Sequence, residues 1–245
     1  MIKECDLSLN SLLKELKEKS NKDKSKDLSR FFKTGPGQYG EGDMFLGITV
    51  PISRKIAIKY INLSLRDISK LLENKYHEVR LVALLILVQK YKILKKQKID
   101  NDKSNKEIVD FYLKNIKYIN NWDLVDLSAG YILGDYLIKN NRKILIKLAK
   151  SNNLWERRIA IISTFAFIYN NEGDWTFKIV DILMKDKHDL IHKACGWMLR
   201  EVGKRVSEKD LIEYLNNHHQ EMPRTMLRYS IERLPEKIRL YYLNL

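Results

Sequence analysis

Five similar helical segments follow one another along this chain, which leaves few folds open to it. HEVRLVALLIL from His77, WDLVDLSAGYIL from Trp122, WERRIAIISTF from Trp155 and LIHKACGWML from Leu190 each open with polar residues and carry a small residue before large apolar ones. PRTMLRYSIERL from Pro223 is a weaker fifth copy. A recurrence at roughly 31–46 residues, with a partner helix before each copy, is typical of HEAT-like helical arrays.

Glycine and proline are scarce and gather near residues 34–51, while apolar residues elsewhere recur at three- and four-residue spacing. Only 45–50 has an extended pattern, which Pro51 ends. The sequence therefore predicts an all-α fold, a single HEAT-like repeat domain over residues 1–245 that curves around a concave basic face. Residues 1–30 would form an N-terminal helix and a lysine-rich segment, and residues 100–106 a polar loop. The predicted helical stretches are 63–91 with a break near 73–75, 108–113, 122–138, 142–149, 155–169, 177–184, 190–202, 211–216 and 226–234.

The charge balance indicates a polyanionic partner. Lysine and arginine number 45 against 31 acidic residues, which gives a net charge of +14. Such an excess favours nucleic acid or an anionic membrane surface, although a solvated basic surface without a partner is the alternative. The longest apolar run, residues 81–88, is far shorter than the ~20 residues of a membrane helix. With no signal peptide at the N-terminus and only Cys5 and Cys195, we expect a cytoplasmic protein that does not enter the membrane.

The segment Asn120-Asn121-Trp122-Asp123-Leu124-Val125-Asp126 carries the most specific chemical signal. Trp122 and Asp126 are four residues apart, so a helix places the indole and the carboxylate on one face. An aromatic ring beside an anion suits a cationic ligand, and an alkylated base in DNA is a cation embedded in a polyanion. The alternative is that the tryptophan belongs to the core and that Asp126 caps a helix or pairs with an arginine.

Other motifs carry weaker signals. Residues 35–40 match G-x-G-x-x-G, but no βαβ unit surrounds them, so the segment is either a structural turn or a loop that contacts DNA through Tyr39. His188 and His192 have the spacing of a zinc helix without a third ligand, and we predict no metal site. Since no nucleophile motif occurs, an enzyme of this sequence would depend on electrostatics and a carboxylate.

Several motifs together resemble the AlkD-type DNA alkylation repair proteins. FFKTGPGQYGEGDMFLGITVP, NNWDLVDLSAGYILGDYL, NLWERRIAIIS, DLIHKACGWMLREVGKR and PRTMLRYSIERL occur in the family's order between about residues 31 and 240. The resemblance implies a HEAT-like solenoid whose concave basic face holds double-stranded DNA. It also implies a DNA glycosylase that excises cationic N3- and N7-alkylated purines without turning the base into a pocket. A monomer without a metal or small-molecule cofactor is expected.

The resemblance also implies roles for individual residues. Trp122, Trp197 and Asp126 match the family's catalytic cleft, and Arg158 and Arg200 match its DNA-backbone arginines. Where a well-studied member carries a glutamine, this chain has a shorter threonine at position 49. Some relatives bind DNA without glycosylase activity, so a non-catalytic DNA-binding scaffold and a protein-interaction array are the alternatives. The remaining residues predicted to bind DNA are Tyr39, Thr49, Arg54, Lys193 and Arg224.

Overall fold

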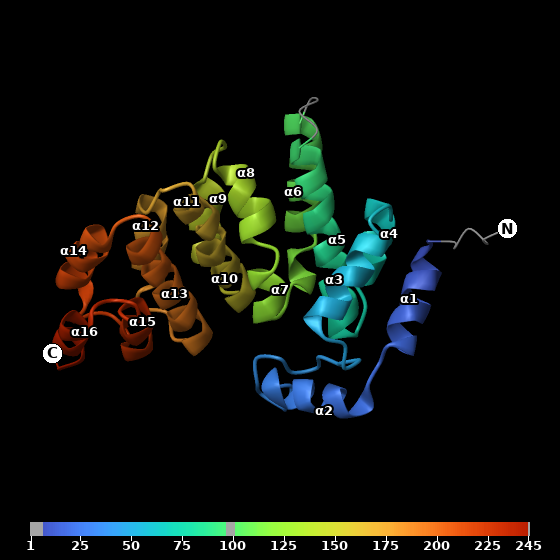
Figure 1. Ribbon diagram of the computed structural model, residues 1–245, viewed down its shortest axis with the longest axis horizontal. Coiled ribbons are helices and arrows are strands. Elements are labelled where there is room, and N and C mark those ends of the chain that lie inside the picture. Colours follow the sequence, from blue (N-terminus) through green and yellow to red (C-terminus); the bar gives the residue numbers. More distant parts are fainter. Residues whose placement is uncertain (1–6, 97–100, 245) are drawn as a thin grey trace. The chain divides into compact units, whose positions relative to one another are not determined.

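The computed structural model describes residues 7–96 and 101–244, in which the chain is helical and contains no β-strand. Its contacts divide the chain into two compact units, residues 1–128 and 129–245, whose helices are labelled in Figure 1. The predicted all-α fold is confirmed, whereas the single domain and its concave face stay predictions. Within the described ranges, no helix is long and apolar enough to cross a membrane.

The first unit is built around a long central helix. Helix α5 is apolar on nearly all sides, and residues 79–88 are buried in it, which is the pattern of a helix enclosed by others. Helices α3, α4, α6 and α7 all contact it. Residues 101–106, predicted as a loop, form the first turns of α6. The elements are α1 (Leu9–Glu18), α2 (Lys22–Phe31), α3 (Val50–Lys59), α4 (Leu65–Leu72), α5 (His77–Lys96), α6 (Asn101–Lys114), η1 (Ile116–Tyr118) and α7 (Trp122–Asp126).

Helix α2, in the lysine-rich segment, docks on the first unit through polar bonds. None of its side chains is buried, and it runs across one end of the unit near α3 (Figure 1). Ser25 Oγ donates to the carbonyl of Phe45 over 2.7 Å, and Asn21 N donates to that of Leu46 over 2.8 Å. Gly47 has a φ of 81°, and a Cβ there would lie 2.0 Å from Asn21 O. Only glycine therefore lets α2 approach this closely.

The second unit packs around α10 and α13. Helix α10 contacts α9 and α13, and α13 also contacts α14 and α15. Cys195 is buried in α13, while Cys5 lies outside the described residues. The sequence did not predict α16. The elements are η2 (Gly130–Gly134), α8 (Asp135–Leu137), α9 (Lys143–Ala149), α10 (Leu154–Ser163), α11 (Phe165–Tyr169), α12 (Asp174–Leu183), α13 (Asp189–Arg205), α14 (Glu208–His218), α15 (Arg224–Ser230) and α16 (Glu236–Asn244).

Two stretches predicted as continuous helices are broken, in each case at a hydroxyl side chain. The stretch 122–138 ends its first helix at Asp126, where Ser128 Oγ donates to the carbonyl of Leu124 over 2.5 Å. The stretch 155–169 breaks at Thr164, whose Oγ1 donates to the carbonyl of Ile161 over 2.7 Å. Serine and threonine compete for backbone carbonyls in this way, which bends or ends helices.

A shared contact unites three of the similar segments. The fourth residue of α5, α10 and α13 bonds back to a loop carbonyl six residues earlier. Arg80 Nη1 and Arg157 Nη1 donate over 2.9 and 3.0 Å, and His192 Nε2 lies 2.5 Å from the carbonyl of Asp186. His188, the other residue of the possible zinc pair, caps α13 by accepting from Leu190 N. These contacts give both histidines structural roles.

Close packing at Gly134 provides a test of the second unit. A Cβ there would lie 2.2 Å from the carbonyl oxygen of Ser163, whereas a Cβ at Gly130 in the same π-helical turn meets nothing closer than 3.4 Å. We expect Gly134→Ala to lower the free energy of unfolding by about 1–3 kcal/mol through overpacking. Gly130→Ala is the matched control and should leave it unchanged or raise it. Equal urea midpoints for the two variants would contradict this packing.

Candidate functional site

Trp122 and Asp126 lie at the two ends of α7 and line one cavity within the first unit. The cavity has a volume of about 540 Å³ and also reaches α2, α3 and α5. Asn121 begins the helix, because its Oδ1 accepts from Trp122 N over 2.8 Å. The indole and the Asp126 carboxylate are both half-buried, so both reach the cavity from a fixed backbone. The pairing of ring and carboxylate predicted from the sequence is present.

Stacked aromatic rings form the inner wall of this cavity. Phe32 stacks on Trp122 with ring centroids 5.1 Å apart, and Phe45 stacks on Phe32 at 5.0 Å. The imidazole of His77 stacks on Phe45 at 4.6 Å. Phe31 meets Trp122 edge-on at 5.9 Å. Because Phe32 occupies one face of the indole, a ligand has only the remaining surface of Trp122 available.

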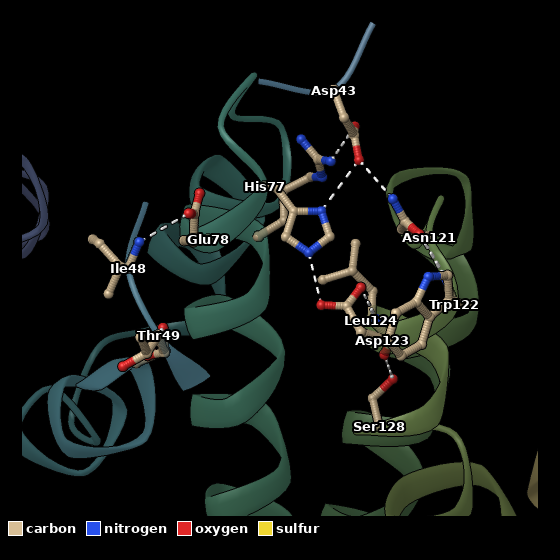
Figure 2. A network of polar contacts seen from close by, with 12 residues as sticks. Asp43, Ile48, Thr49, His77, Glu78, Asn121, Trp122, Asp123, Leu124 and Ser128 are labelled. Carbon is tan, nitrogen blue, oxygen red and sulfur yellow. Dashed lines mark hydrogen bonds and ion pairs between the residues drawn. The ribbon is translucent and has the colours of Figure 1, made fainter. Parts of the chain in front are cut away.

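Behind the stack, a buried ionic network ties α7 to α5 (Figure 2). His77 Nε2 lies 2.8 Å from Asp123 Oδ2, and His77 Nδ1 lies 3.1 Å from Asp43 Oδ2. Asp43 also accepts from Arg80 Nη2 over 2.6 Å and from Asn121 Nδ2 over 3.0 Å. Asp123 Oδ1 accepts from Leu124 N, as expected of a residue in a helix start. Asn121, which caps α7, and Asp123, in its first turn, are therefore both held by residues outside the helix.

The two carboxylates make His77 cationic. Burial by itself lowers the pKa of His77, but the charge and hydrogen bond of Asp123, together with those of Asp43, outweigh it and raise that pKa to about 9. Burial opposes ionisation of Asp43, yet its bond to His77 and the charge of Arg80 hold the pKa of its carboxyl below the usual value. With both nitrogens of His77 protonated, the cations His77 and Arg80 face the anions Asp43 and Asp123 in the buried network.

A second buried carboxylate fixes the segment that precedes α3. Glu78 accepts hydrogen bonds from the backbone nitrogens of Leu46, Gly47 and Ile48 over 2.8, 2.8 and 3.1 Å. Thr49 follows directly as the residue before α3, where its side chain makes no capping bond, and it is exposed and lines the cavity. The predicted DNA contact at Thr49 therefore belongs to the same cavity as Trp122 and Asp126.

The other residues of the first unit that are predicted to contact DNA, Tyr39 and Arg54, do not line this cavity. The glycine-rich loop is a turn in which Gln38 Oε1 accepts from Gly35 N and Glu41 Oε2 accepts from Gly37 N. In the same loop, Tyr39 OH donates to the carbonyl of Phe31 over 3.4 Å. Arg54 is exposed on α3. Contact of these side chains with DNA stays a prediction.

The residues of the second unit that are predicted to form the site or bind DNA make contacts with other residues of that unit. The Trp197 ring lies 5.7 Å from Phe165, and Arg158 is buried, with Nη1 donating to the carbonyl of Leu190 over 2.6 Å. Because Trp122 and Trp197 belong to different units, their shared cleft stays a prediction. The remaining basic residues bond as follows: Arg200 to Glu232 and Glu201, Lys193 to Asp189, and Arg224 to the carbonyl of Leu243.

Sequence reasoning missed most of the network and the wall of the cavity. Asp43 and His77 are 34 residues apart, and His77 and Asp123 are 46 apart, so no local spacing joins them. In the sequence, Phe31 and Phe32 stand out only as the start of the motif FFKTGPGQYGEGDMFLGITVP. The one available signal was the polar pair His77-Glu78 at the start of the most apolar helix, where two buried titratable groups need partners.

The network predicts how stability depends on pH. The folded pKa of His77 is about 9 against an ordinary value of 6.5, so its contribution is complete below about pH 6.5 and is lost as the pH rises through 9. Between these values the free energy of unfolding should fall by up to about 1.4 kcal/mol per pH unit.

Urea unfolding from pH 6.5 to 9.5 measures this slope. The control variant His218→Gln, in the second unit, should keep it, and His77→Gln should flatten it. A native stability that does not change over this range would contradict a charged His77.

Comparisons with known proteins agree with the helical fold. A solved structure described as a predicted DNA alkylation repair enzyme from Enterococcus faecalis is similar over 89% of this chain and 97% of its own, with 16% identity and a TM-score of 0.67. Together with the paired helices, this likeness confirms the predicted fold of HEAT-like helical repeats.

Two structures from Streptococcus mutans are more distant. AlkD2 has 16% identity and a TM-score of 0.48, with 92% of this chain and 99% of that chain covered. Smu.31 has 18% identity and a TM-score of 0.46, with 91% and 95% covered. No curated protein matches the sequence. The profile of the family described as DNA alkylation repair enzyme matches residues 12–234. The chain therefore belongs to the DNA alkylation repair enzyme family.

Proposed function

We propose that this chain is a DNA glycosylase that hydrolyses the N-glycosidic bond of N3- and N7-alkylated purines in double-stranded DNA without turning the base into a pocket. Membership of the DNA alkylation repair enzyme family supports repair as the role and DNA as the partner. The observation that carries the finer proposal is the pair on α7, where Trp122 and Asp126 line one cavity. A ring and a carboxylate held together in a protein of net charge +14 suit a cationic base within DNA.

The substrate supplies most of the driving force. An N3- or N7-alkylated purine carries a positive charge, and it leaves as a neutral base when it takes the electrons of the bond to C1′. The deoxyribose then gains oxocarbenium character. Asp126 stabilises this charge and accepts the proton of the water that attacks C1′, as carboxylates do in sugar hydrolysis. No metal or cofactor is needed for these steps.

Selectivity arises from charge. The exposed part of the Trp122 ring attracts a cationic nucleotide by roughly 0.5–2 kcal/mol, and Trp197 is proposed to act in the same way. A neutral base gains little from a ring and a carboxylate, and it is also a poorer leaving group. Undamaged purines are therefore excluded by chemistry at two steps, binding and bond cleavage.

The basic residues are proposed to hold the phosphates without reading sequence. In the first unit Thr49 is exposed and lines the cavity, Arg54 is exposed on α3, and Tyr39 bonds to the carbonyl of Phe31. The second unit offers Arg158, Arg200, Lys193 and Arg224, which DNA phosphates would recruit in place of their partners within the chain. We propose that the protein acts in this way as a monomer in the cytoplasm.

Replacing the carboxylate tests the proposed chemistry. Asp126→Asn removes the negative charge but keeps the shape, so release of 7-methylguanine or 3-methyladenine from methylated duplex DNA should slow on the order of 100-fold. Folding and DNA affinity should persist. Asp110→Asn, on the exposed face of α6, is the matched control and should act like the native protein. Unchanged release by Asp126→Asn would refute the mechanism, and a native protein that binds DNA but frees no base would be a non-catalytic scaffold.

Salt dependence tests the predicted phosphate contact of Arg54. Each phosphate neutralised by a basic side chain adds about 0.9 to the slope of log K against log salt concentration. Arg54→Ala should reduce the slope by about this amount and leave thermal unfolding unchanged, because Arg54 is exposed. Arg66→Ala removes another exposed arginine, on α4, and should keep the native slope. Equal slopes for both variants, measured by fluorescence anisotropy, would exclude the contact.

A further inference from the structure

We propose that a lysine-lined hollow in the second unit binds the phosphate backbone of DNA. The hollow has a volume of about 600 Å³ and lies where α9 leads into α10 and α12 leads into α13. Lys150, Lys185 and Lys187 line it from these two connecting segments, and no sequence motif marked them. This inference rests on the part of the proposed function that makes DNA the partner, and it does not depend on base release.

The three lysines are available to a ligand. All are exposed, and among the residues that the structure describes their side chains make no ion pair or hydrogen bond. Two cations nearby are paired by contrast, Arg157 with Asp186 and Lys193 with Asp189. A hollow lined by charges of one sign concentrates ions of the opposite sign. The three ammonium groups therefore favour an anionic ligand.

The acid in the lining of the hollow is already neutralised. Asp186 Oδ2 accepts from Arg157 Nε over 2.6 Å, and its Oδ1 accepts from His188 N over 2.8 Å. The Asp186 side chain is only 6% exposed, so little of its charge reaches a ligand. Burial lowers the pKa of His188, which also lines the hollow and is therefore neutral near neutral pH. The charge that a ligand meets is thus that of the three lysines.

Arg157 also shapes the hollow for a phosphate. Its Nη1 donates to the carbonyl oxygens of Ser151 and Asn152, both over 3.0 Å, so these two acceptors are occupied and repel an anion less. Because the same guanidinium binds Asp186, it joins the two segments that carry the lysines. Residues 149, 182 and 183 add apolar side chains to the lining. This surface suits a sugar–phosphate chain, which has apolar sugar carbons between its charged groups.

The two segments lead directly into residues that are predicted to contact DNA. Arg158 follows Arg157 in α10, and its Nη1 donates to the carbonyl of Leu190, three residues after Lys187. Lys193 lies one turn further along α13. Phosphate contacts of this kind fix the position of the duplex without reading its sequence. The hollow therefore extends the predicted phosphate contacts of the second unit.

A triple variant of the hollow tests the contact. Lys150→Ala, Lys185→Ala and Lys187→Ala together should lower the slope of log K against log salt concentration by about 0.9 for each lysine that meets a phosphate, and by about two in total. At about 0.1 M salt, DNA affinity should fall on the order of tenfold or more. Fluorescence anisotropy of a labelled duplex measures both quantities. Thermal unfolding should stay native, because all three lysines are exposed.

A second triple variant controls for net charge. Lys143→Ala, Lys209→Ala and Lys237→Ala remove the same charge from exposed positions of α9, α14 and α16 that do not line the hollow. This variant should keep the native slope and release 7-methylguanine from methylated duplex DNA at the native rate. An equal loss of slope in both triple variants would reflect net charge alone and would overturn the proposal.

Acetylation of lysines in the native protein identifies the ligand. The protein is labelled with sulfo-N-hydroxysuccinimide acetate alone, with duplex DNA or with pyrophosphate, and mass spectrometry measures the label at each lysine. Duplex DNA should reduce labelling of Lys150, Lys185 and Lys187 several-fold and leave the three control lysines unchanged. Protection by pyrophosphate without protection by DNA would mean that the hollow takes a free anion, and would overturn the proposal.

The outcomes separate this inference from the proposed function. A native slope in the variant of the hollow, or no protection of its lysines by DNA, would overturn the hollow while base release stands. DNA binding that requires the hollow, in a protein that frees no base from methylated DNA, would support the hollow and overturn the glycosylase. A protein that does not bind DNA would overturn both.

Discussion

The ion pairs of His77 with Asp43 and Asp123 are the interaction on which the candidate site depends. Helix α7 has only five residues, too few to be stable alone, yet it carries both Trp122 and Asp126. The imidazolium holds its first turn through Asp123, and Asp43 holds its cap through Asn121. His77 also supports the aromatic stack that ends on Trp122. The Asp126 carboxylate, on so short a helix, thus obtains its position from buried charge rather than from helix length.

The architecture could be predicted from the sequence because it is local. Three- and four-residue spacing of apolar side chains identified the helices of both units, and similar segments identified the repeat. The bond from Arg80, Arg157 and His192 to a carbonyl six residues earlier also recurs in these segments. Sequence comparison does not reveal it, because arginine makes the bond in two segments and histidine in the third. The breaks at Ser128 and Thr164 were missed, since a hydroxyl ends a helix only when it bonds the backbone.

The site was predictable only in part. Trp122 and Asp126 share a helix face, so their pairing followed from spacing. The network and the cavity join residues of α2, α5, α7 and the segment between α2 and α3, which periodicity does not bring together. The net positive charge suggested that the basic side chains would be available to bind DNA. In the structure Arg158 is buried and donates to a carbonyl, and Arg200 pairs with two carboxylates. Whether an arginine faces DNA or its own chain depends on distant acceptors.

The docking of α2 through backbone groups affects how such a protein can evolve. Its contacts with residues 45–47 use the main chain of Asn21, the Ser25 hydroxyl and the bare face of Gly47, so they persist when the other side chains of α2 change. Mutations at Lys24, Asp27 or Leu28 would reshape one wall of the cavity while the core around α5 keeps its packing. Drift in this one helix can thus change the shape of the cavity with little penalty in folding.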